Sequence, residues 1–146
     1  MKNTFTILCL FFTLNTFSQY KNDSTAIVNL LINDYNTMGT WDLKKHVANC
    51  TDNYLLVENG EIWDMKRESK WYHENANRII NRKNYFDIKY VRIYKDIGYA
   101  VYNLRSDITE KGILTTKTWL ESVIFRKGKG LWKIELIHST PTELKK

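Results

Sequence analysis

The sequence predicts an α+β fold, in which three helices from the N-terminal half pack on one face of a curved antiparallel sheet. Apolar residues recur at helical spacing between residues 24 and 80, whereas apolar and polar residues alternate from residue 85 onward. A run of helices followed by a run of strands is typical of the α+β class. Three helices are too few to cover both faces of such a sheet. The other face is therefore expected to be polar or buried by a second copy.

The first two predicted helices are adjacent in the chain, and the second is short. Ser24 is the expected N-cap of the first helix, which ends at Gly39. Its apolar side follows helical spacing through Ile27, Leu30, Leu31, Tyr35 and Met38. Thr40 is the expected cap of the second helix, with Asp42 in the first turn. Its inward positions are expected at Leu43, Val47 and Cys50.

A small hairpin is expected between the second and third helices. Residues 54–57 and 62–63 have strand character, and Asn59-Gly60 between them is a strong two-residue turn signal. Asp64 then caps the third helix, which is expected to continue to the asparagines at 81 and 84. The apolar positions of this helix recur at Met65, Tyr72, Ala76, Ile79 and Ile80.

Four longer strands are predicted after the third helix, over residues 85–94, 99–106, 119–126 and 132–140. The last two form a hairpin through a Lys-Gly-Lys-Gly turn. Strict alternation predicts that Trp132, Ile134, Leu136 and His138 share one face of the last strand. On the strand before it, Glu121 shares a face with Trp119, Val123 and Phe125, and the sequence leaves open whether that face is inner or outer.

The first 18 residues are interpreted as a cleaved signal peptide, which leaves one domain over residues 19–146. Lys2 precedes an apolar stretch over residues 5–17 that is too short and too interrupted for a stable membrane anchor. The mature protein is therefore expected to be secreted or periplasmic. Cys50 is then its sole cysteine, which excludes an intrachain disulfide and a thiolate metal cluster.

The charge distribution is not that of a nucleic-acid-binding protein. The chain has 22 basic and 16 acidic residues, for a formal net charge of +6. The basic residues occur singly or in pairs among carboxylates, whereas nucleic-acid-binding proteins have clustered basic stripes. We therefore expect no nucleic-acid partner.

Three stretches resemble SnoaL-like domains of the nuclear transport factor 2-like superfamily. They are residues 52–61 (DNYLLVENGE), residues 96–101 (DIGYAV) and the end of the chain from Gly130 to Thr140. The resemblance implies an α+β cone with a cavity between helices and sheet, commonly dimeric through the sheet. The superfamily includes ketosteroid isomerase, polyketide cyclases, dehydratases, a kinase association domain and many proteins with no known activity.

Three ionisable residues are candidate catalytic groups. His138 is expected near the mouth of the cone, and Glu121 lies within an aromatic stripe. Ketosteroid isomerase relatives carry a general-base aspartate just after the first strand, where this chain has Glu58 followed by Asn59. Because an amide does not accept a proton as a base, Glu58 is the candidate at this place. For His138 and Glu121, a structural role at the rim or the surface is the alternative.

The candidate ligand-binding residues are mainly aromatic, namely Tyr54, Trp63, Trp71, Trp119 and His138. His46 and Cys50 lie on one side of the second helix, where a buried, unreactive Cys50 is favoured over a thiolate–imidazole pair. The three histidines lie on separate elements, and no metal motif or cofactor motif is present. We therefore expect neither a metal nor a cofactor.

Three functional hypotheses remain open from the sequence. The first is an exported domain that binds a small, partly apolar molecule in an aromatic-lined cavity. The second is an acid–base enzyme of the isomerase, cyclase or dehydratase type, using His138 with Glu121 or Glu58. The third is a non-catalytic homodimeric interaction module, whose outer sheet face includes Leu120 and Ile124.

Overall fold

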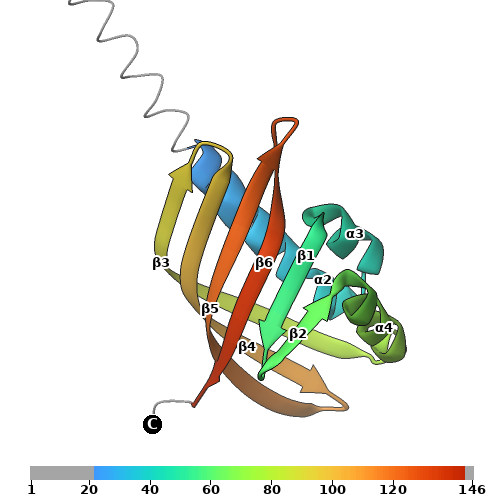
Figure 1. Cartoon of the computed structure of the whole chain (residues 1–146). Coiled ribbons are helices and arrows are strands. Elements are labelled where there is room, and N and C mark those ends of the chain that lie inside the picture. Colours follow the sequence, from blue (N-terminus) through green and yellow to red (C-terminus); the bar gives the residue numbers. More distant parts are fainter. Residues whose placement is uncertain (1–21, 144–146) are drawn as a thin grey trace, which may run out of the picture.

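The computed structural model describes residues 22–143, and the predicted signal peptide lies outside these residues. The described chain begins with a helix over residues 22–35, followed by three shorter helices and six strands (Figure 1). The helices are α2 (Thr37–Thr40), α3 (Leu43–Asn49) and α4 (Met65–Asn75). The strands are β1 (Cys50–Glu58), β2 (Glu61–Asp64), β3 (Ile80–Tyr94), β4 (Ile97–Glu110), β5 (Ile113–Gly128) and β6 (Leu131–Thr142).

The six strands form one curved sheet in the order β2-β1-β6-β5-β4-β3. Neighbouring strands are antiparallel except for β1 and β6, which run parallel. The prediction of a curved sheet with helices on one face is therefore confirmed, and the sheet is mixed where we expected it to be purely antiparallel. β1 and β6 are next to each other in the sheet, although α4 and four other strands lie between them in the chain.

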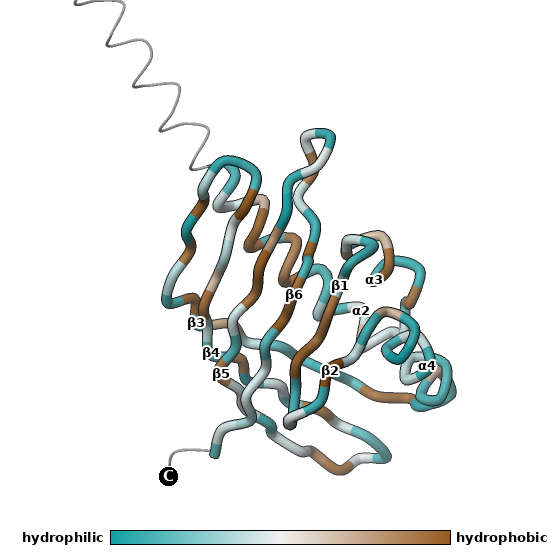
Figure 2. The backbone as a smooth tube through the Cα atoms, viewed as in Figure 1, coloured by the Kyte–Doolittle hydropathy of each residue, from teal (hydrophilic) through white to brown (hydrophobic). Residues whose placement is uncertain are grey.

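The core lies between the helix of residues 22–35 and the inner face of the sheet. Ile27 and Leu31 of this helix are fully buried and pack against apolar side chains of β1, β4, β5 and β6. Figure 2 shows hydrophobic segments on β1, β5 and β6. Asp23 fixes the helix to the last hairpin, because its carboxylate accepts hydrogen bonds from Lys127 Nζ (2.7 Å) and Trp132 Nε1 (3.0 Å).

The first two helices differ from the prediction at their boundaries. The first helical segment is interrupted by a turn at Asn36, before α2. Asp42, and not Thr40, caps α3, because its side chain accepts a hydrogen bond from the Lys45 amide. On α3 the expected inward residue Val47 is 43 % exposed, and His46 is buried in its place.

The small hairpin and the start of α4 are confirmed. Asn59 and Gly60 both have positive φ, as the two-residue turn requires. Asp64 caps α4 by accepting a hydrogen bond from the Arg67 amide. The helix ends at Asn75, earlier than expected, and Ile80 already pairs with Glu110 in the sheet. Pairing along the whole of β3 therefore overrides the helical spacing that includes Ile79 and Ile80.

A β-bulge in β6 changes which residues face the core. Phe125 pairs with Ile134, but the preceding residue Ile124 pairs with Leu136, so Glu135 is an extra residue on β6. Beyond such a bulge, the alternation of faces is reversed. The predicted alternation is therefore correct for Trp132 and Ile134 and wrong for the rest of the strand.

The residues after the bulge lie on faces opposite to those expected. Ile137 and Ser139 are buried on the inner face, whereas His138 is exposed. Leu136 pairs with Leu55 and Ile124, both of which are exposed. On the inner face, Trp132 and Ile134 are therefore followed by Ile137 and Ser139, where we expected Leu136 and His138.

Candidate functional site

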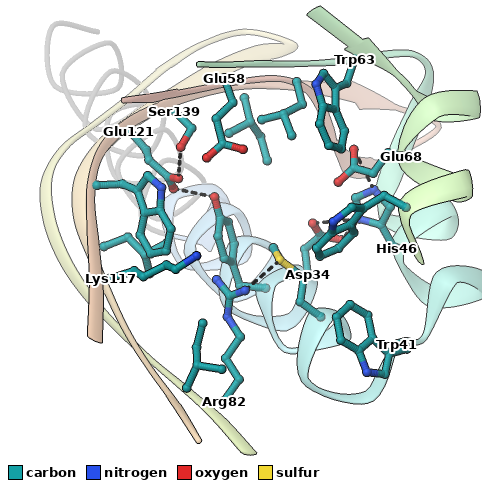
Figure 3. Close-up of a pocket in the computed structure, with 18 of the residues that line it drawn as sticks. Asp34, Trp41, His46, Glu58, Trp63, Glu68, Arg82, Lys117, Glu121 and Ser139 are labelled. Carbon is teal, nitrogen blue, oxygen red and sulfur yellow. Dashed lines mark hydrogen bonds and ion pairs between the residues drawn. The ribbon is translucent and has the colours of Figure 1, made fainter. Parts of the chain in front are cut away.

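A cavity of about 310 Å³ lies between the inner face of the sheet and the helices (Figure 3). Every strand of the sheet except β2 contributes two or more lining side chains, and β2 contributes one. The aromatic lining consists of Tyr35, Trp41, Tyr54, Trp63, Trp71 and Trp119. The ionisable groups of the lining, apart from tyrosine, are Asp34, His46, Glu58, Glu68, Arg78, Arg82, Lys117 and Glu121. The site therefore combines aromatic walls with charged groups of both signs.

One row of paired residues crosses the inner face of the sheet. Glu58 on β1 pairs with Ser139 on β6, which pairs with Glu121 on β5, which pairs with Tyr102 on β4. Because paired residues of neighbouring strands point to the same face, the two carboxyl groups lie on the inner face with Ser139 between them. This pairing settles that the inner face of β5 is the one with Trp119 and Glu121.

Glu121 is a buried carboxylate that already has two hydrogen-bond donors. Tyr35 donates to its Oε2 at 2.5 Å, and Ser139 donates to its Oε1 at 2.7 Å. Burial raises the pKa of Glu121 above its usual value, although the donors oppose the shift and Glu58 reinforces it. The carboxyl group therefore connects the helix of residues 22–35 to β5 and β6 at the floor of the cavity.

On the helical side of the cavity, His46 lies between two carboxylates. Its Nδ1 is 3.0 Å from Oδ1 of Asp34, and its Nε2 is 3.6 Å from Oε2 of Glu68. Burial alone would lower the pKa of His46, but the interactions with Asp34, Cys50 and Glu68 outweigh it and raise the pKa far above its ordinary value. The imidazole is therefore a buried cation between Asp34 and Glu68.

The rest of this cluster holds the imidazole ring in place. The ring stacks on Tyr72, with centroids 5.2 Å apart, and meets the edge of Tyr54 at 5.4 Å. Asn49 donates a hydrogen bond to Asp34 at 2.9 Å. Glu68 differs from Asp34, because its buried Oε2 is too far from His46 Nε2, at 3.6 Å, for a hydrogen bond and has no other hydrogen-bond partner within the described residues. Such an atom is costly unless a donor reaches it, so a ligand donor would complete it.

On the sheet side of the cavity, Arg82 is held by neutral groups. Its guanidinium donates to Asn84 Oδ1 at 2.9 Å, to Ser106 Oγ at 3.1 Å and to Met38 Sδ at 3.3 Å. Burial lowers the pKa of Arg82, although an arginine remains protonated under such conditions. Lys117 pairs with Ser106 across β4 and β5, so the two cations are neighbours along the cavity wall.

Asp34, His46 and Cys50 each offer a metal-ligating atom, and these atoms lie within 4.8 Å of one another. The Cys50 sulfur is almost equally far from Nδ1 (4.0 Å) and Nε2 (3.9 Å) of His46, so it lies along the lone pair of neither nitrogen. Burial raises the pKa of the Cys50 thiol to about 11, whereas a metal requires the thiolate. The geometry fits an ion pair beside a thiol better than a metal centre.

The cavity brings together most of the residues singled out from the sequence. Tyr54, Trp63, Trp71, Trp119, Glu58 and Glu121 all lie along its lining. His73, near the end of α4, is exposed and is not part of it. The nitrogen of Trp63 donates to Glu61, and the Arg67 guanidinium lies 4.4 Å from the centre of the Trp63 ring.

His138 is the exception, and its predicted place at the cavity is wrong. It pairs with Ser122 and Val57 in the sheet and is exposed, while its neighbour Ser139 lines the cavity. The bulge at Glu135 causes this reversal. His138 therefore lies on the opposite side of the sheet from Glu121 and Glu58, and it does not share a bound molecule with either.

Four lining residues on which the later argument depends were not predicted from the sequence, namely Asp34, Glu68, Arg82 and Lys117. Asp34 lies three residues after Leu31 and seven after Ile27, and Glu68 lies four residues before Tyr72. An acidic residue within the apolar side of an amphipathic helix is a signal of a buried polar group. Arg82 gave no such signal, because its position was assigned to a helix.

No family model and no curated protein match the sequence, whereas many solved structures match the fold. A ketosteroid isomerase-like protein from Erwinia carotovora atroseptica superposes with a TM-score of 0.67 at 16% identity, over 84% of this chain and 98% of that one. An NTF2-like protein from Cytophaga hutchinsonii has a TM-score of 0.65 at 14% identity, over 80% and 95%. A protein of unknown function from Mycobacterium tuberculosis has a TM-score of 0.77 at 11% identity, over 88% and 76%.

The chain therefore has the nuclear transport factor 2-like fold, an α+β cone whose helices cover the inner face of a curved, unclosed sheet. The resemblance noted from three short stretches is confirmed at the level of fold. Identities of this size show the fold alone, so function has to be argued from the cavity. Within residues 22–143, no helix combines the length and the apolar character needed to cross a bilayer.

Proposed function

We propose that this protein binds a small, partly apolar molecule in the cavity of the cone. The observation that supports this most directly is a cavity of about 310 Å³ lined by six aromatic side chains together with eight ionisable groups other than tyrosine. Ligand pockets typically have volumes of about 300–1,000 Å³ and combine aromatic walls with polar groups that orient the ligand. The cavity is at the small end of that range, which favours a compact ligand.

A thermal-shift screen with matched variants tests this proposal. Trp119 lines the cavity, and its neighbour Leu120 is 47 % exposed on the outer face of the same strand. A ligand that binds the folded state raises the melting temperature according to its concentration and dissociation constant. We expect Trp119→Ala to remove the shift caused by a compact aromatic compound and Leu120→Ala to preserve it. The absence of a shift with every apolar and aromatic compound would reject a binding function.

An acid–base enzyme is the second candidate, because Glu121 and Glu58 face the same cavity and burial raises the pKa of Glu121. His138 no longer takes part in this hypothesis. The test is to incubate each ligand from the screen with the protein and to follow its mass and NMR spectrum. Conversion that is lost in Glu58→Gln supports catalysis, whereas an unchanged ligand identifies a binding protein.

A homodimer through the outer face of the sheet is the third part of the proposal. Tyr99 on β4 and Leu120 and Ile124 on β5 are all more than a third exposed on this face. Exposed apolar patches of this kind mark interaction surfaces. Light scattering should give twice the mass of the chain, and Ile124→Glu should reduce it to that of a monomer. A monomer at all concentrations tested would contradict this arrangement.

Export is proposed on the basis of the first 18 residues alone. Expression of the full chain in a bacterium with a periplasm should give a mature protein that begins at Gln19, which intact mass spectrometry would show. Retention of residues 1–18 in the cytoplasm would contradict the interpretation as a signal peptide.

A further inference from the structure

The charges around the cavity form two groups, one on the helical side and one on the sheet side, where Glu58 and Glu121 also lie. The helical side holds Asp34 and Glu68 around the cationic His46, so its carboxylates are partly neutralised within the protein. The sheet side holds Arg82 and Lys117, and none of the ion pairs among residues 22–143 involves either of them. Two cations without a carboxylate partner thus line one wall of the cavity.

Arg82 is the more informative of these two cations. Its three hydrogen-bond partners are an amide, a hydroxyl and a thioether, all of which are neutral. These contacts fix the plane of the guanidinium and use three of its five N–H groups. Glu121 and Glu58 act on Arg82 through space, but neither accepts a hydrogen bond from it. A hydrogen-bonded anion would therefore offset more of the cost of burying this charge.

The neighbouring cations have different environments. Arg78 also lines the cavity, but its guanidinium donates two hydrogen bonds to Glu110 at 2.9 and 2.6 Å.

Figure 3 shows the side chains of Arg82 and Lys117 extending toward the middle of the cavity, with Glu58 at the opposite edge. Trp119 lies beside them, with its ring 6.0 Å from the Arg82 guanidinium. An anion between Arg82 and Lys117 would therefore place an attached ring against Trp119.

The carboxylates of Glu121 and Asp34 are held by other partners and do not pair with Arg82 or Lys117. Both oxygens of Glu121 accept hydrogen bonds from Tyr35 and Ser139. Asp34 is engaged by His46 and Asn49. On the helical side, Oε2 of Glu68 makes no hydrogen bond among the described residues and faces His46 Nε2 only at 3.6 Å, so it can accept one from a ligand.

We propose that the ligand of this cavity is an organic acid, whose oxyanion binds between Arg82 and Lys117 while a hydrogen-bond donor at its other end meets Glu68. The apolar body of the acid, an aromatic ring in the simplest case, packs against Trp119. This inference rests on the proposed binding function and adds to it the chemical class of the ligand. A carboxylate and a phosphate ester share the required oxyanion chemistry.

Matched acids and amides test this assignment. The probes are benzoate, 3-phenylpropionate and indole-3-acetate, the three corresponding primary amides, and phenyl phosphate, measured by calorimetry at constant ionic strength and pH 7. Each amide keeps the shape of its acid and lacks the charge. We expect at least one acid to bind about tenfold or more tightly than its amide, since hydrogen bonds to charged groups are the stronger ones. Comparison with phenyl phosphate distinguishes a carboxylate site from a phosphate site.

Three single-residue variants locate the effect. Arg82→Gln and Lys117→Gln should each abolish the preference for the acid. The control is Lys83→Gln, because Lys83 follows Arg82 on β3 and is exposed on the opposite face. Among the described residues, the Lys117 side chain makes no hydrogen bond or ion pair, so Lys117→Gln should fold normally. This variant keeps the test valid if Arg82→Gln does not fold. A second test concerns the contact with Glu68. The parent protein should bind 4-hydroxybenzoate more tightly than benzoate, and Glu68→Gln should bind the two with equal affinity.

The possible outcomes separate the two proposals. Equal binding of acids and amides would overturn the organic-acid inference and leave the binding function intact. An acid preference that persists in both Arg82→Gln and Lys117→Gln would also overturn it. If no acid, amide or phosphate binds, while neutral compounds from the wider screen do, the inference fails alone. If nothing binds in either experiment, the binding function fails with it.

Discussion

At the scale of single residues, two buried groups make the stability of the fold depend on pH. Glu121 and His46 both have a pKa in the folded state above the ordinary value. In each case the folded state holds the proton more tightly than the unfolded state does. The stability contributed by such a group is fully present below its unfolded pKa and is lost as the pH rises through its folded pKa.

For Glu121, the decrease in stability begins near the unfolded pKa of about 4.5. We predict that Glu121→Gln removes this contribution, so the variant gains stability relative to the parent protein as the pH rises from about 4.5 toward neutrality. Urea denaturation at several pH values measures the difference. Glu135→Gln is the control with opposite sign, because the ion pair with Arg126 lowers the pKa of Glu135. A difference that does not change with pH would contradict the account of Glu121.

His46 stabilises the fold by neutralising charge on the helical side of the cavity. We predict that His46→Gln destabilises the protein by about 3–5 kcal/mol, because Asp34 and Glu68 then remain buried without a cation. Adding Asp34→Asn should recover part of the loss, and a double-mutant cycle measures the coupling between the two. Strictly additive effects would show that the ion pair is not the cause. The His46 contribution should also decrease as the pH rises above about 6.5.

At the scale of elements, the bulge in β6 decides which side chains reach the cavity. Without the extra residue Glu135, the outer face would carry Ile137 and Ser139, and His138 would point inward. A bulge of this kind depends on pairing with β5, which single-strand alternation does not contain. Strict alternation therefore placed His138 correctly relative to Leu136 and wrongly relative to Trp132.

A pair of adjacent variants tests the effect of the bulge. His138→Ala should change the free energy of unfolding by no more than about 0.5 kcal/mol and leave ligand affinity unchanged, since the side chain is exposed on the outer face. Ser139→Ala removes a hydrogen-bond donor from Glu121 and should destabilise the protein by about 1 kcal/mol. The opposite ranking of the two variants would contradict the observed register.

The whole molecule shows what the sequence alone can and cannot predict. The alternation of β5, the Asn59-Gly60 turn and the Asp64 cap depend on neighbours in the chain, and the structure confirms them. Six of the candidate site residues lie along one cavity, because the sheet and α4 turn their side chains to the inner side of the cone.

The predictions that failed depend on contacts between distant segments. Asp34 meets Glu68 through His46 only when the first helix, α3 and α4 pack together. The position of Arg82 on a strand was missed because Ile79 and Ile80 continue the helical spacing of α4, whereas pairing with β4 determines the structure there. Local patterns therefore predicted the fold. The places of Asp34, Glu68 and Arg82 at the cavity became evident only from the three-dimensional structure.

The central claim is that the cavity inside the cone is the binding site, and the five tryptophans of the chain provide the most direct test. Trp41, Trp63, Trp71 and Trp119 line the cavity, whereas Trp132 does not, because its indole nitrogen donates to Asp23 at the other end of the core. Each indole N–H gives its own signal in a proton–nitrogen correlation spectrum. On titration with a ligand from the screen, we predict that the Trp63 and Trp119 signals shift and saturate together while the Trp132 signal stays fixed. Saturable binding that leaves all four cavity signals unchanged would contradict the claim.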